Sequence, residues 1–136
     1  MNRLLKIVLL IIVGTLLATL AWGAQKTEVY TATVDSKGVQ KIEMLAGEFY
    51  FKPNDVIVKK NVPVEISIKK EPGYAAHSLV LHAPETGIDL NVALGTDAKM
   101  IRFTPTKAGK YAFYCDKGLI EKHRAKGMEG VLEVTE

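Results

Sequence analysis

The fold of this chain is constrained most by a series of short runs in which apolar and polar residues alternate. The clearest run, residues 64–69, places valine or isoleucine at every even position and a polar residue at every odd position. A period of two is the pattern of a strand with one buried face and one face in water. No helical period is sustained after residue 24. About eight such runs with turns between them predict an all-β domain, an antiparallel sandwich or barrel.

Two segments interrupt these runs. Residues 83–94 contain Pro84 and Gly87, and we expect them to be irregular around one helical turn. Residues 116–130 are polar, and we expect them to hold one short helix. The sequence therefore predicts two longer connections among otherwise short turns.

The first 24 residues form a separate unit. Two positive charges, at Arg3 and Lys6, precede an apolar run that ends in small residues. This layout predicts an N-terminal hydrophobic helix that serves as a cleaved signal peptide. A retained membrane anchor is the alternative, because residues 4–22 approach the ~20 apolar residues that cross a bilayer. In either case we expect residues 25–136 to form one domain outside the cytoplasmic membrane, in the periplasm or another extracytoplasmic space.

The charge of that domain is nearly balanced. The chain has 18 basic and 15 acidic residues, and two of the basic ones precede residue 24, which leaves 16 against 15. A net charge of +1 lacks the basic excess that nucleic-acid binding needs. The sequence also lacks a Ser-His-Asp arrangement, a glycine-rich phosphate loop and an open metal site beside a general base. We therefore expect neither a nucleic-acid-binding protein nor an enzyme.

Cys115 is the only cysteine in the chain. It cannot form a disulfide within the chain, although exported domains of this size often contain disulfides. In an oxidising compartment a lone thiol is oxidised unless it is buried or bound to a metal. Cys115 is therefore a candidate metal ligand.

Three further candidate ligands accompany this cysteine. His123 follows it by eight residues, Met128 follows His123 by five, and His77 stands at the start of an upstream strand. Thiolate and thioether sulfur suit Cu(I), and imidazole suits both oxidation states. Two histidines and one cysteine with a weak axial methionine make a blue-copper site. The four residues thus predict a site for one copper ion that alternates between Cu(I) and Cu(II).

Strand alternation selects one of two upstream histidines. His77 shares a strand face with two leucines, whereas His82 lies on the opposite face. Cys115 shares a face with two aromatic residues of its own strand, Tyr111 and Phe113. We therefore predict that His77 and Cys115 point inward and that His82 points outward.

From about residue 39 to its end, the chain resembles the cupredoxin family, which includes plastocyanin and azurin. The matching motifs are Phe51-Lys52-Pro53, Val56-Ile57-Val58-Lys59, His77-Ser78, Ala108-Gly109-Lys110-Tyr111, Tyr114-Cys115 and Gly127-Met128-Glu129-Gly130. The resemblance implies a Greek-key β-sandwich of about eight strands. It also implies a type 1 copper site whose ligands are His77, Cys115, His123 and Met128.

One connection departs from the plastocyanin pattern. The loop between Cys115 and His123 is longer here and is similar to the copper domain of cytochrome oxidase subunit II. In that domain a second cysteine precedes the histidine. Leu119 holds its place in this chain, which excludes a thiolate-bridged binuclear centre. The long loop leaves the axial ligand open between Met128, the carbonyl oxygen of Ala76 and water.

These observations favour a single-electron carrier, in which a rigid sandwich keeps the ligands in one geometry and the electron leaves through His123. The alternative is a copper carrier or chaperone that delivers copper to an oxidase or reductase, because a long polar loop favours release. A metal-free sandwich that binds another protein is a third hypothesis.

The ligand loop also predicts a partner. It carries four basic residues, which we interpret as a docking surface for a redox partner that is acidic near this loop. An ordinary solvated loop is the alternative interpretation. Attachment to the membrane, if the first segment is retained, would run through residues 4–22. The basic residues are Lys117, Lys122, Arg124 and Lys126.

Overall fold

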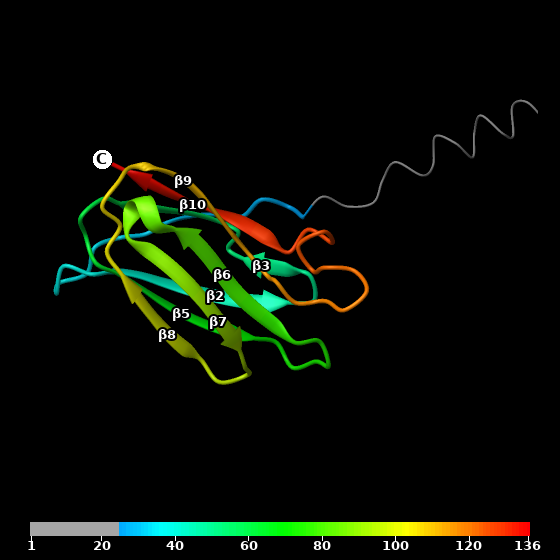
Figure 1. Ribbon diagram of the computed structural model, residues 1–136. Helices are drawn as coiled ribbons and strands as arrows, with labels where there is room; N and C mark the ends of the chain where they lie inside the picture. The colour runs from blue at the N-terminus through cyan, green and yellow to red at the C-terminus, as the bar shows by residue number, and fades with distance from the viewer. Residues whose placement is uncertain (1–24) are drawn as a thin grey trace, which may run out of the picture.

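The computed structural model describes residues 25–136 (Figure 1). The predicted N-terminal helix, and the choice between signal peptide and anchor, lie outside these residues. Within residues 25–136, no helix is both long and apolar enough to cross a lipid bilayer.

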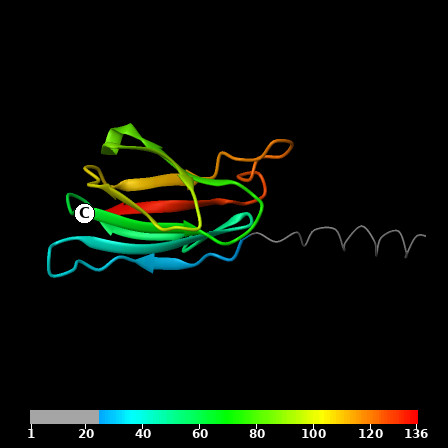
Figure 2. The ribbon, with the colours of Figure 1, turned by 90° about the horizontal axis from the view of Figure 1, so that it is seen from below.

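The described chain forms ten strands in two sheets, which Figure 2 shows as two stacked layers. The larger sheet contains, in spatial order, β1 (Val29–Thr31), β4 (Asp55–Lys59), β10 (Glu129–Thr135), β9 (Gly109–Tyr114), β6 (His77–Ala83) and β7 (Ile88–Leu94). The smaller sheet contains β3 (Tyr50–Lys52), β2 (Gln40–Gly47), β5 (Val64–Lys70) and β8 (Lys99–Phe103). The 3-10 turn η2 (Pro84–Thr86) connects β6 to β7.

The core lies between the two sheets and follows the alternation in the sequence. In β5 the valine and isoleucine side chains are buried while the polar residues between them are more exposed, which confirms the period-two prediction. Phe51 of the smaller sheet packs edge-to-face against Phe113 of the larger one, with 5.4 Å between ring centroids. Aromatic pairs of this geometry stabilise a core beyond the area that they bury. The predicted all-β sandwich is therefore confirmed.

The strand pairing is more mixed than predicted. Three of the eight pairings among the described strands are parallel: β1 with β4, β4 with β10, and β2 with β5. The sequence predicted about eight antiparallel strands. Alternation indicates which face of a strand is buried and gives no strand direction, so the parallel pairs could not be predicted from it. Successive strands that cross between the two sheets can return parallel to an earlier strand.

Both segments that were expected to interrupt the strands differ from the prediction. Residues 88–94 form β7, which pairs with β6 along its whole length at the edge of the larger sheet. The helical turn at η2 was predicted correctly, but the irregular continuation was wrong. The polar segment forms turns up to Met128 and contains no helix before β10 begins at Glu129. Gly118 and Gly127 have positive φ values of 110° and 96° there, which an α-helix does not admit.

Several elements meet at one end of the sandwich. The ligand loop (residues 116–128) follows β9 and leads into β10, and the upstream loop (residues 71–76) leads into β6. Both loops project from the same end in Figure 1. The turn between β2 and β3 lies beside them, since Phe49 of this turn contacts His123 of the ligand loop. We call this the ligand end.

Candidate metal centre

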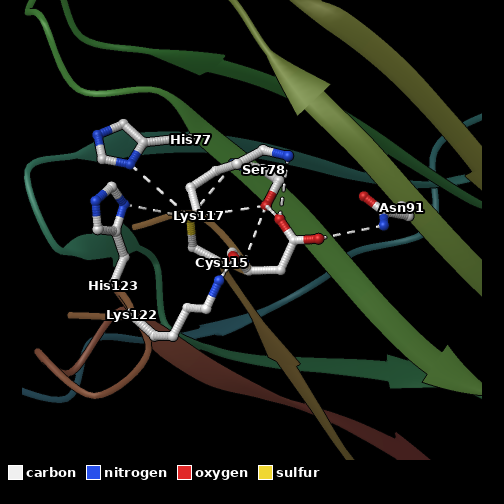
Figure 3. Close-up of polar contacts among 8 residues, drawn as sticks. His77, Ser78, Asn91, Cys115, Lys117, Lys122 and His123 are labelled. Atoms are coloured by element: carbon white, nitrogen blue, oxygen red, sulfur yellow. Dashed lines mark hydrogen bonds and ion pairs between the residues drawn. The ribbon is translucent and has the colours of Figure 1, made fainter. Parts of the chain in front are cut away.

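Three of the predicted ligands converge at the ligand end. His77 begins β6, Cys115 directly follows β9, and His123 lies in the ligand loop. One donor atom from each lies within 4.8 Å of the others. Figure 3 shows both imidazole rings beside the Cys115 sulfur. Residues far apart in the sequence are therefore gathered because β6 and β9 are neighbours in the larger sheet.

The three side chains are close and well covered. Cys115 Sγ lies 3.6 Å from His123 Nδ1 and 4.0 Å from His77 Nδ1, and the two imidazole centroids are 5.1 Å apart. Cys115 is fully buried, while His77 is 3% and His123 9% exposed. A soft sulfur and two imidazoles facing one small volume out of water fit copper better than they fit Ca²⁺ or Mg²⁺, which prefer oxygen.

Strand register places Met128 beside this cluster. Glu129 is paired with Tyr114 in the β9–β10 ladder, so Met128 stands opposite Cys115 one step further along. The Cys115 amide donates a hydrogen bond of 3.1 Å to the Met128 carbonyl, which confirms this pairing. Directly opposed residues have Cβ atoms about 5 Å apart on the same face. Met128 is fully buried and belongs to the same core cluster as Cys115.

The backbone of the ligand loop fixes the positions of these residues. The His123 amide donates to the carbonyl of Lys117 at 2.9 Å, and the Met128 amide donates to the carbonyl of His123 at 3.0 Å. The loop therefore closes on itself around His123, although many of its side chains are exposed. A long loop with internal hydrogen bonds can hold a ligand in place.

Ser78 contacts the Cys115 sulfur, as Figure 3 shows, and Asp116 is hydrogen-bonded to Ser78. The Ser78 amide points at Cys115 Sγ at 3.4 Å, and the Ser78 hydroxyl donates to Asp116 Oδ1 at 2.7 Å. The Asp116 amide in turn donates to the Ser78 hydroxyl at 3.1 Å. Asn91 and Lys117 contact the same carboxylate. Hydrogen bonding around a cysteine sulfur tunes the potential of a copper site.

The electrostatic surroundings favour neutral imidazoles and an ionised Asp116. Burial lowers the pKa of both His77 and His123, and the positive charge of Lys126 lowers that of His123 further. The hydrogen bond from Ser78 lowers the pKa of Asp116. A neutral imidazole has a free lone pair, which is the form that binds a metal. Protons therefore compete little with a metal for His77 and His123 at neutral pH.

The structure also shows where the remaining singled-out residues lie. His82 is exposed on β6, with its Nδ1 atom 3.0 Å from Asp89 Oδ1. Leu119 is fully exposed and takes no part in the cluster. The structure thus brings His77, Cys115, His123 and Met128 to one place, while their role as ligands stays a prediction.

Two contributors were not assigned a role from the sequence. Ser78 was noted only as part of a motif, and its amide contact with the sulfur follows from the position of β6 beside β9. Phe49 has its ring centroid 4.9 Å from that of His123. It sits in the turn between β2 and β3, and no local pattern indicates what such a turn contacts.

Comparison with known proteins agrees with this geometry. The sequence model of the cupredoxin-like domain matches residues 10–131. No curated protein sequence matches the chain at a significant level.

Solved structures share the fold. The chain is similar to the metal-binding domain of the Cu(I)-exporting P-type ATPase CopA from Streptococcus pneumoniae D39, solved with Cu(I), at 28% identity and a TM-score of 0.61, covering 82% of this chain and 99% of that one. It is also similar to reduced auracyanin from Roseiflexus castenholzii, at 20% identity and a TM-score of 0.59, covering 77% and 99%. A chain of a heme-copper terminal oxidase matches at 19% identity and a TM-score of 0.56, covering 96% and 95%.

The family match spans most of the chain, and the histidine and cysteine donors lie together at one end of the sandwich. Both findings support copper binding. The chain belongs to the cupredoxin-like family.

Proposed function

We propose that this domain binds one copper ion through His77, Cys115, His123 and Met128 and carries single electrons outside the cytoplasmic membrane. The observation that carries the proposal is the convergence of one sulfur and two imidazole donors within 4.8 Å in a buried site. Copper bound there would supply one-electron chemistry between Cu(I) and Cu(II). The extracytoplasmic location is supported by the character of the first 24 residues.

The surrounding chain would keep the donors in nearly the same positions in both oxidation states. His77 and Cys115 are attached to neighbouring strands, and Met128 is paired with Cys115 through the backbone. The Ser78 amide restrains the sulfur. A closely packed interior resists displacement of its side chains. An electron carrier requires that its ligands move little between the two oxidation states.

Titration of the metal-free domain with Cu(II) tests this proposal. We expect one equivalent to bind and to produce an intense visible absorption from the bond between the Cys115 sulfur and copper. The colour should bleach on reduction and return on oxidation over many cycles. A domain that binds no copper, or that loses its copper on reduction, would contradict the proposal.

A copper carrier is the second candidate, favoured by one specific observation. Among the solved structures described above, the one with the highest identity is a metal-binding domain of a Cu(I)-exporting ATPase. A carrier would prefer Cu(I), remain colourless and give up the ion to a competing chelator within minutes. The titration above separates the two functions, because a stable coloured Cu(II) form is expected only of the electron carrier.

The ligand end also offers a docking surface. Because most of its basic residues are paired, we propose a mainly apolar contact in place of the acidic partner predicted from the sequence. Tyr74 of the upstream loop and Leu119 and Ile120 of the ligand loop are fully exposed. Most basic residues of the ligand loop have an acidic neighbour there: Lys117 pairs with Asp116, Arg124 with Glu129, and Lys126 with Glu121. Their net field is therefore small, and apolar contact is the larger contribution to docking.

Electron self-exchange between reduced and oxidised copper protein provides a test that needs no known partner. We expect Leu119→Ser combined with Ile120→Ser to slow self-exchange about tenfold, because the apolar contact near the metal is lost. NMR line broadening in mixtures of both forms measures the rate. Val34→Ser is the control, since the bridge of Val34 to Gln40 places this exposed valine at the opposite end of β2. An unchanged rate in the double variant would refute the docking surface.

A further inference from the structure

We propose that Phe49 is a positioning residue that clamps the His123 ring and slows the loss of copper from the site. The proposal rests on the proposed copper site and adds a residue that decides how long the ion stays. The β2–β3 turn would then help to hold a copper ligand in addition to joining two strands.

The clamp consists of three groups in contact, the side chains of His123, Phe49 and Lys126. The Phe49 ring meets the His123 ring edge-to-face, with centroids 4.9 Å apart and an interplanar angle of 69°. Lys126 Nζ lies 4.3 Å from the Phe49 centroid, in the position of a cation–π contact. His123 and Lys126 belong to the same loop, and the Lys126 amide donates to the His123 carbonyl at 3.1 Å. One ring from the β2–β3 turn is thus held by two residues of the ligand loop.

The backbone at Phe49 is in an uncommon conformation. Its φ is 69°, in the left-handed region that bulky side chains rarely occupy. Gly47, two residues earlier, lies so close to the Tyr50 ring that a Cβ atom there would overlap it. Backbone strain of this kind persists only where the surroundings hold it. At Phe49 the strained conformation is the one that directs the ring at His123.

The clamp joins a turn of the smaller sheet to the ligand loop of the larger one. Phe49 joins β2 to β3 in the smaller sheet, whereas the ligand loop joins β9 to β10 in the larger one. Figure 1 shows β3 beside the start of β10. Movement of the ligand loop away from the smaller sheet must therefore break the contact between Phe49 and His123.

The exposure of His123 shows what the clamp achieves. The neighbouring Lys122 and Arg124 are exposed, whereas His123 is only 9% exposed. Copper can leave only after a ligand separates from it, and His123 is the histidine held in a loop, whereas His77 belongs to a strand. Because Phe49 lies against the ring, loss of the Phe49 side chain would free the His123 ring to rotate on that side. Removal of the Phe49 ring should therefore speed release.

The experiment compares Phe49→Gly with Phe49→Tyr in the full domain. Glycine adopts a φ of 69° without strain, so the turn should keep its path while the ring is lost. Tyrosine keeps the ring. Transfer of Cu(I) to an excess of a coloured Cu(I) chelator should be about tenfold faster from the glycine variant and unchanged in the tyrosine variant. Asn61→Gly is the matched control, because Asn61 also has a positive φ, 60°, but lies in the turn between β4 and β5.

A second readout uses the protein without metal. NMR relaxation of the His123 ring should show greater mobility in Phe49→Gly than in the wild-type and Asn61→Gly proteins. Equal mobility, or equal release rates, would overturn the clamp even if copper binds. If copper does not bind at all, the proposed function fails, and the mobility of His123 alone then decides the clamp. Thermal unfolding of each variant shows whether release is faster at unchanged stability.

Discussion

Replacement of Cys115 by serine is expected to abolish the visible absorption of the copper-loaded domain and to remove most of its copper affinity. Serine has nearly the same size, so the fully buried position remains filled. Its hydroxyl is a hard, protonated donor, whereas the thiolate is the soft anionic ligand that both copper states favour. Loss of an outer hydrogen-bond partner costs ~10–100-fold in metal affinity, and loss of the sulfur itself should cost more. Copper content after dialysis and the visible spectrum measure the result.

Two histidine variants serve as a matched pair for this prediction. His77→Ala should also lower copper content, because His77 Nδ1 lies 4.0 Å from the Cys115 sulfur. His82→Ala changes a histidine of the same strand that is exposed and paired with Asp89. Copper content should therefore be unchanged in His82→Ala. Equal loss in both variants, or a coloured Cys115→Ser protein, would show that the ion is bound elsewhere.

The second large effect is expected from Gly118→Ala in the ligand loop. Gly118 has a φ of 110°, a conformation that alanine rarely adopts. A Cβ atom there would also overlap the Glu121 carbonyl oxygen and lie 2.9 Å from Lys122 Cα. Both contacts are with backbone, which cannot simply rotate away. The variant should lose about 1–3 kcal/mol of stability, and the hydrogen bond from His123 to Lys117 should break. Copper affinity should fall about tenfold or more as His123 is displaced.

Gly38→Ala separates backbone strain from displacement of the loop. Gly38 also has a positive φ, 78°, but a Cβ atom there meets no atom within 4 Å. It lies in the turn before β2, where its amide donates to the Asp35 carbonyl. Urea unfolding should show a loss of about 1 kcal/mol with unchanged copper affinity. If Gly118→Ala bound copper as tightly as Gly38→Ala, the closed loop would not be what positions His123.

The sequence predicted those features that depend on local pattern and residue chemistry. Alternation identified the buried faces, so the sandwich and the contrast between buried His77 and exposed His82 could be derived. The position of Met128 could not be derived in this way, because the length of the ligand loop left open how close Met128 comes to the other predicted ligands. The pairing of Cys115 with Met128 brings the two residues to opposite positions, since a hairpin brings the two ends of a loop together however long the loop is. Met128 as the axial ligand stays a prediction.

Features that depend on contacts between distant segments could not be derived. The alternation of β7 was present in the sequence, but Pro84 and Gly87 obscured it, since both residues are typical of loops. Parallel pairing depends on the order of strands in space, which alternation leaves open. The contact between Phe49 and His123 arises only when the two sheets are stacked, so neither segment indicates it alone.

The short pairing between β6 and β9 has a consequence for the stability of the protein. These strands pair only at Val80 with Tyr114 and at Leu81 with Phe113, and His77 and Cys115 stand beyond the last pair. Any ion held by both side chains closes a chain segment of 38 residues. It does so at a point where the pairing between β6 and β9 has already ended. A protein with one cysteine can form no internal disulfide, so the ion is its available cross-link. Because ligand binding to the native state adds to stability, resistance to unfolding depends on metal supply.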